Sequence, residues 1–141
     1  MFKFAHLRDE AFADVSAADF EACQRVFQAI QEAGIEALTG SQESVEAMKG
    51  VFARRRDLVV EGLASIGIKV PKPLGTFYIW ARVPAGYTSA EFAEGLIERI
   101  GIVVTPGSGF GDEGEGYFRI SITTPEARIR EGMARLKELR L

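Results

Sequence analysis

The chain has 141 residues, of which 47% are hydrophobic and 26% are charged, so it has the length and apolar content of one ordinary domain with its own core. Its 17 Lys and Arg residues against 20 Asp and Glu residues give a formal net charge of -3, which leaves no basic excess for the phosphates of a nucleic acid. No apolar run approaches the ~20 residues of a membrane span, so we expect a cytoplasmic protein with neither a nucleic-acid nor a membrane partner.

The first half of the chain predicts helices. Ser16 is a suitable N-cap, and apolar residues then recur at three- and four-residue steps to about Leu38, so a helix is predicted that ends at Gly40. The single cysteine, Cys23, lies on this apolar stripe and is expected to be a small buried hydrophobe. A second helix is predicted from Ser41, with Gly67 as its stop.

The second half predicts short strands interleaved with two more helices. Strands are predicted at residues 68–71, 76–83, 102–105 and 116–123. A capping box at Thr88 and Glu91 starts a helix that Gly101 ends, and Thr124 is expected to cap a final helix. These elements predict an α/β sandwich, in which helices pack on one face of a small, mostly antiparallel sheet.

Arg119 stands out because it places a permanent cation in the middle of a predicted strand. Alternate residues of a strand share a face, which groups Phe118, Ile120 and Ile122 on one side and Tyr117, Arg119 and Ser121 on the other. The planar guanidinium suits a carboxylate held by two parallel hydrogen bonds. The alternative is that Arg119 lies on a solvated face and binds nothing.

The strand predicted over 76–83 carries two aromatic residues on the face that should be solvated. Phe77, Ile79 and Ala81 alternate with Tyr78 and Trp80, so one set can face the helices while the other faces away. Two exposed aromatics indicate a surface built to meet something, whereas ordinary cross-strand packing is the alternative.

A glycine-rich segment at 107–111 invites a phosphate-binding interpretation. It lies between two predicted strands, whereas a phosphate cradle leads from a strand into a helix N-terminus. Asp112, Glu113 and Glu115 follow it and would repel phosphate. We therefore expect a flexible connection here and no cofactor-phosphate site. His6 has no cysteine or second histidine beside it, so no metal site is expected either.

Three stretches taken together resemble a known family. They are Pro73–Trp80, Val103–Gly111 and Gly114–Thr123, and residues 26–40 and 54–59 look similar too. The chain resembles the C-terminal part of pyridoxal-phosphate-dependent class I/II aminotransferases, the fold type I or aspartate aminotransferase superfamily, and most closely the LL-diaminopimelate aminotransferase type. The resemblance implies that residues 26–141 are the small domain of such an enzyme. Residues 1–25 do not resemble the family and have no assigned role.

The resemblance also implies roles for individual residues. In the family, the arginine at the position of Arg119 grips the α-carboxylate of the amino acid or 2-oxo acid. Gly75, Tyr78, Trp80 and Phe110 are expected on the substrate side or at the interface with the large domain. The glycine-rich segment would approach the substrate when the small domain closes and would help to exclude water. The implied activity is amino-group transfer in amino-acid biosynthesis.

The family's chemistry needs a lysine that forms a Schiff base with pyridoxal phosphate, normally in a Ser-x-x-Lys stretch. None of the five lysines, Lys3, Lys49, Lys69, Lys72 and Lys137, stands in such a stretch. We therefore expect no catalytic and no cofactor-binding residue in this chain, and no activity from it alone. Its expected partners are the missing cofactor-binding large domain, in the same parent chain or a separate one, and a second copy of itself in a homo-oligomer.

Two other interpretations remain open at this point. The chain could be a free-standing module that binds carboxylates or proteins through the face of Tyr78, Trp80 and Arg119. It could also be the remnant of a split aminotransferase gene. The sequence does not identify the substrate side chain, which in this superfamily is read largely outside this region.

Overall fold

The computed structural model describes residues 16–139, so the predictions for His6 and for the role of the first fifteen residues lie outside it. The chain divides into two compact units, one that ends at Ser44 and one that starts at Val45, and each is considered by itself. Within the described residues, no helix is both long and apolar enough to cross a membrane.

In the first unit, helix α1 runs over Ala17–Thr39. The Ser16 hydroxyl accepts a hydrogen bond from the backbone N–H of Asp19, and Gly40 follows the last turn, so both predicted ends are confirmed. No residue of α1 is buried, and Cys23 is exposed, so the expectation of a buried cysteine was wrong. The apolar stripe that motivated it is real, but it lies on the surface: Leu38, for example, is 84% exposed.

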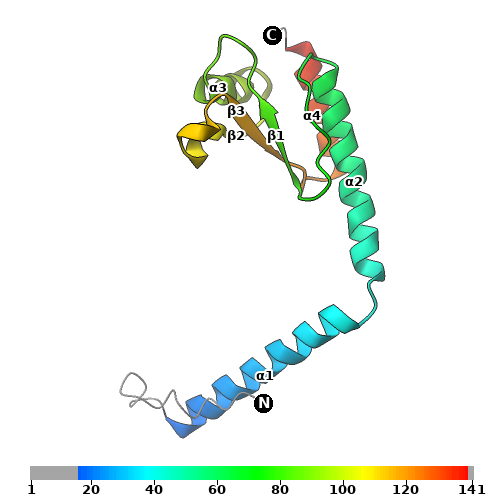
Figure 1. Ribbon diagram of the computed structural model, residues 1–141, viewed down its shortest axis with the longest axis vertical. Helices are drawn as coiled ribbons and strands as arrows, with labels where there is room; N and C mark the ends of the chain where they lie inside the picture. Colours follow the sequence, from blue (N-terminus) through cyan, green and yellow to red (C-terminus); the bar gives the residue numbers. More distant parts are fainter. Residues whose placement is uncertain (1–15, 140–141) are drawn as a thin grey trace. The chain divides into compact units, whose positions relative to one another are not determined.

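The second unit is an α/β fold, as predicted (Figure 1). Its elements are α2 (Glu43–Ala64), β1 (Tyr78–Arg82), α3 (Ser89–Ile100), β2 (Thr105–Pro106), β3 (Tyr117–Ser121) and α4 (Glu126–Glu138). The three strands form an antiparallel sheet in the order β1-β3-β2, so β3 is the central strand.

The helices cover one face of this sheet. The core joins Val59 and Leu63 of α2, Leu96 of α3 and Ile129 and Leu136 of α4 to Ile79, Ala81 and Phe118 of the strands. Along β1, buried Ile79 and Ala81 alternate with outward-facing residues, which confirms the predicted two-sided strand. Phe77 lies just outside the strand and is 43% exposed, but its ring centroid lies 6.0 Å from that of Phe52 on α2, so it faces the helices as predicted.

Two predicted strands were misplaced for the same physical reason. Residues 68–71 form no strand, because the N–H of Ile68 bonds the carbonyl of Leu63 and so completes the end of α2. In the same way the N–H of Ile102 bonds Leu96 at the end of α3, and β2 starts only at Thr105. The apolar residues after each helix are anchors that terminate the helix, although their composition is typical of strands.

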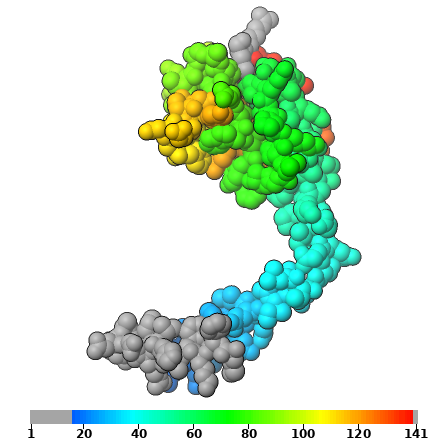
Figure 2. All heavy atoms as spheres, viewed as in Figure 1, coloured from blue at the N-terminus to red at the C-terminus, as the bar shows by residue number. Residues whose placement is uncertain are grey.

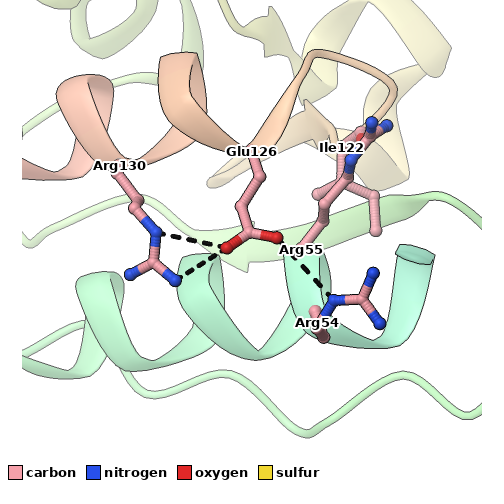
Figure 3. Close-up of polar contacts among 5 residues, drawn as sticks. All are labelled: Arg54, Arg55, Ile122, Glu126 and Arg130. Atoms are coloured by element: carbon pink, nitrogen blue, oxygen red, sulfur yellow. Dashed lines mark hydrogen bonds and ion pairs between the residues drawn. The ribbon is translucent and has the colours of Figure 1, made fainter. Parts of the chain in front are cut away.

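Charged side chains of α2 and of α4 itself contact the start of α4 (Figure 3). The predicted cap, Thr124, is not used: Pro125 precedes the first turn and no side chain caps it. Glu126 lies 2.7 Å from Nη2 of Arg130 and 3.8 Å from Nε of Arg54. Arg55 donates to the backbone carbonyl of Thr123 at 2.9 Å, so α2 also holds the segment that leaves β3.

Candidate functional site

The face of the sheet that the helices leave uncovered carries the predicted site residues. Alternation along β1 and β3 places these residues on it: Tyr78, Trp80, Arg82, Tyr117, Arg119 and Ser121. The strand register sets Arg119 opposite Trp80 on one side and opposite Thr105 on the other. Arg119 therefore lies in the middle of the central strand, where the backbone on both sides is held by the sheet.

Two aromatic rings hold the guanidinium of Arg119. Its central carbon lies 4.1 Å from the ring centroid of Tyr78 and 4.6 Å from that of Phe110. Across residues 16–139 it has no hydrogen bond and no ion pair, although the residue is half-buried. A cation–π contact uses no N–H donor of the guanidinium for a conventional hydrogen bond, so these donors stay available to a ligand. An oriented, unpaired cation of this kind suits a carboxylate ligand.

Trp80 and Tyr117 extend the aromatic surface beside Arg119. The Trp80 ring meets the Phe110 ring edge-on at 5.4 Å and stacks on the Tyr117 ring at 5.8 Å. Trp80 is nevertheless 38% exposed and Phe110 is 51% exposed. The structure thus brings together four of the five predicted site residues.

Gly75, the fifth, lies outside this cluster. It stands three residues before β1 begins, and a Cβ added to it would meet no atom within 4 Å. The special backbone here belongs to the next residue: Thr76 has a φ of 72°, in the left-handed region that a β-branched residue rarely adopts. The predicted strand start at Thr76 was wrong for this reason, since a strand needs extended backbone.

The glycine-rich segment folds as two 3₁₀ turns where the sequence predicted a flexible connection. The turns are η2 (Gly107–Phe110) and η3 (Asp112–Gly114). Their backbones touch, because a Cβ on Gly107 would overlap the carbonyl oxygen of Gly114. The segment, yellow to orange, projects at the edge of its unit (Figure 2) and presents Phe110 to Arg119.

A network that the sequence did not predict ties these turns to α3. The carboxylate of Glu115 accepts 2.8 Å hydrogen bonds from both the backbone N–H and the hydroxyl of Ser89, the fully buried first residue of α3. The Ser89 hydroxyl also lies 3.0 Å from that of Ser108 in η2. The bonds from Ser89, first the backbone and then the side chain, and one from the Gly116 N–H hold the pKa of Glu115 below its usual value.

A sequence signal for this network existed. Thr88 is recognisable as a helix cap, so Ser89 was certain to present an N–H at a helix start, where a carboxylate is favoured. Which carboxylate would reach it could not be deduced, because Glu115 is 26 residues away in the chain.

The described residues do not fit pyridoxal phosphate. Lys49 and Lys72 are exposed and pair with Glu46 and Asp57, while Lys69 and Lys137 are exposed on other surfaces. The glycine-rich turns lead into strand β3 and not into a helix N-terminus that would hold a phosphate. Among residues 16–139, no group of three or more His, Cys, Asp or Glu side chains could hold a metal ion.

Comparison with known proteins identifies the class to which this fold and site belong. The family Aminotransferase class I and II matches residues 15–136, so the chain is a member of that family. It is 51% identical over 113 residues to the LL-diaminopimelate aminotransferase of Moorella thermoacetica and 54% identical over 112 residues to that of Halothermothrix orenii. These matches cover 80% and 79% of the chain.

Solved structures show the same arrangement. An aromatic aminotransferase from Pyrococcus horikoshii superposes with a TM-score of 0.72 at 39% identity, over 77% of this chain and 30% of that one. BacF from Bacillus subtilis gives a TM-score of 0.71 at 37% identity, over 79% of this chain and 29% of its own. The chain thus spans about 29% of the length of the curated relatives that it matches.

Proposed function

We propose that residues 26–141 act as the small domain of a pyridoxal-phosphate-dependent aminotransferase and supply the arginine that binds the substrate carboxylate. The whole protein would transfer an amino group between an amino acid and a 2-oxo acid. The observation that carries this proposal is Arg119: it is central in the sheet, in contact with two aromatic rings and free of any ion pair within the described residues.

Arg119 would bind and orient the substrate and would take no chemical step. Two parallel hydrogen bonds from the fork fix both the position and the plane of an α-carboxylate, which restricts rotation of the reacting carbon. Tyr78, Trp80 and Phe110 surround the cation with apolar surface. This surface lowers the local polarity and strengthens the charge-assisted bonds.

The cofactor and its lysine would belong to the large domain, which corresponds to the part of the relatives' length that this chain does not span. The large domain, in the same parent chain or a separate one, is accordingly the first partner that we propose. The relatives at 51% and 54% identity are named for LL-diaminopimelate, so this compound is the first amino donor to test.

A chimaera tests the role of Arg119. Residues 26–141 replace the matching segment of the Moorella thermoacetica enzyme, and kcat/KM is measured with the amino donor. Loss of a charge-assisted bidentate contact is worth roughly 2 to 4 kcal/mol, so Arg119→Ala should lower kcat/KM about 30- to 1000-fold. Arg119→Lys keeps the charge without the fork and should recover only part of this loss.

Arg99→Ala is the matched control, because Arg99 is an exposed arginine on α3 away from the site. It should change kcat/KM less than about threefold, as expected for a solvated charge. Thermal melting of each variant checks the folded fraction. An Arg119→Ala chimaera that is folded and transaminates as well as its parent would mean that Arg119 is only a surface arginine.

A further inference from the structure

We propose that Phe110 is a positioning residue for Arg119, and that the Glu115–Ser89 bonds hold Phe110 in place. The orientation of Arg119 by Phe110 concerns this chain alone. The consequence of that orientation for carboxylate binding rests on the proposed function. No part of the proposal requires Phe110 to touch a substrate.

The position of Phe110 is unusual for a large apolar side chain. Its ring is 51% exposed, yet it meets both the guanidinium of Arg119 and the edge of the Trp80 ring. Tyr78 also contacts Arg119, but it belongs to β1, where the sheet fixes its direction. Of the two rings that contact Arg119, only that of Phe110 is carried by a projecting turn; the other is carried by a strand.

Three features fix that turn. Gly107 and Gly114 bring η2 and η3 into backbone contact. Gly111, directly after Phe110, has a φ of 106°, a backbone conformation that favours glycine. Glu115 closes the segment against the start of α3 through its two bonds to Ser89. The chain runs from Phe110 past Glu115 into β3, which carries Arg119, so closing this segment against α3 would keep Phe110 beside Arg119.

The consequence is an oriented cation. An arginine side chain has several rotatable bonds, and restricting them before a ligand arrives lowers the entropy cost of binding. A ring on a half-buried guanidinium contributes an amount between the exposed and the desolvated limits, which corresponds to about a 2- to 30-fold change in affinity. Loss of Phe110 should therefore free the Arg119 side chain and weaken carboxylate binding by a factor in this range.

The test uses the 141-residue chain labelled with ¹⁵N-arginine. The Nε–H resonance of Arg119 is assigned by its disappearance in Arg119→Lys. Phe110→Ala should shift this resonance and increase the mobility seen in its relaxation, and Phe110→Leu should do so in part. Glu115→Ala should have the same direction of effect, although the hydrogen bonds of the Glu115 carboxylate go to Ser89 and not to Arg119.

Tyr87→Ala is the matched control, since Tyr87 is an aromatic ring of similar exposure, 42%, that packs on Phe92 and not on Arg119. It should leave the Arg119 resonance unchanged. If Phe110→Ala and Phe110→Leu leave the shift and relaxation of Arg119 as in the parent, the positioning role is overturned.

Titration with acetate separates this proposal from the proposed function. Acetate should shift the Arg119 resonance in the parent, with an apparent Kd that rises about 2- to 30-fold in Phe110→Ala. If Phe110→Ala mobilises Arg119 while acetate perturbs Arg119 in no variant, positioning is supported and the carboxylate role is contradicted. If acetate binds the parent and Phe110→Ala equally well, Phe110 does not prepare the site for a ligand.

Discussion

Arg119 and Thr76 are two residues whose local chemistry departs from what a folded domain needs for stability alone. A half-buried arginine without an ion pair forgoes the partner that usually offsets its desolvation. A threonine at a φ of 72° holds its backbone in a disfavoured region. Thr76 lies two residues before Tyr78, whose ring contacts Arg119.

The strain at Thr76 predicts a stabilising substitution. Glycine adopts positive φ without a steric penalty, so Thr76→Gly should raise the free energy of unfolding by about 1 kcal/mol, after the larger backbone entropy of glycine is subtracted. Thr105→Gly is the control, because Thr105 lies in β2 and glycine weakens a strand. Urea unfolding followed by far-UV circular dichroism measures both, and a destabilised Thr76→Gly protein would show that the Thr76 side chain offsets its strain.

At this scale the sequence predicted well whatever depends on strand alternation. The outward direction of Tyr78, Trp80 and Arg119 follows from a period of two and is observed. The contact between Phe110 and Arg119 could not be deduced, because it depends on the path of two 3₁₀ turns. The partner of Ser89 was likewise set by a long-range contact that no local pattern reports.

Among the elements, the paired turns η2 and η3 connect the site to the rest of the fold. They join β2 to β3, and Phe110 is the last residue of η2. Glu115, directly after η3, is bonded to the start of α3. Sequence reasoning recognised the glycines but interpreted them as flexibility. Two of them are instead required where two backbone segments approach closely, and this approach depends on the tertiary structure. The misplaced strands after α2 and α3 have a similar origin, since helix-ending bonds used the residues that looked like strand.

Gly107→Ala should disrupt the paired turns, because the added Cβ would overlap the carbonyl oxygen of Gly114. The turn must then open and carry Phe110 away from Trp80, so the fluorescence emission of Trp80 should shift to the red. Gly109→Ala is the control within the same turn, since its Cβ would meet no atom within 4 Å. Equal spectra for the two variants would show that the chain accommodates the overlap without moving Phe110.

The bonds from Ser89 to Glu115 predict a pH dependence of stability. They lower the pKa of Glu115 in the folded state from an ordinary value near 4.5, so they stabilise the fold fully above that value. This contribution is lost as pH falls through the lower pKa of the folded state. The free energy of unfolding of the parent should therefore approach that of Glu115→Gln in acid.

Glu115→Gln is a suitable reference because neighbouring groups titrate in both proteins. The pKa of Glu91 is also lowered, chiefly by its bond from the Thr88 backbone N–H, and its titration cancels in the comparison apart from its repulsion by Glu115. Urea unfolding at a series of pH values gives the difference. A difference that stays constant from neutral pH into acid would mean that the Glu115 bonds do not stabilise the fold.

For the whole molecule, the observed fold class and the family match are the ones that the sequence predicted. In this fold Arg119 lies on the sheet face that the helices do not cover. The fold class followed from the order of the elements, and family membership followed from motifs whose spacing the structure explains. The boundary at residue 26 stays a prediction, and the two compact units divide at Ser44. The chain spans about 29% of the length of the curated relatives, so the role of Arg119 in a whole enzyme stays a proposal.

The most direct test of the carboxylate role compares two amino donors in the chimaera described above. One is the amino acid, and the other is the matching amine without its α-carboxylate. Arg119→Ala should lower kcat/KM for the amino acid about 30- to 1000-fold and leave that for the amine within about threefold, because only the first donor offers the group that Arg119 binds. Equal losses for both donors would contradict the role of Arg119 in binding the carboxylate.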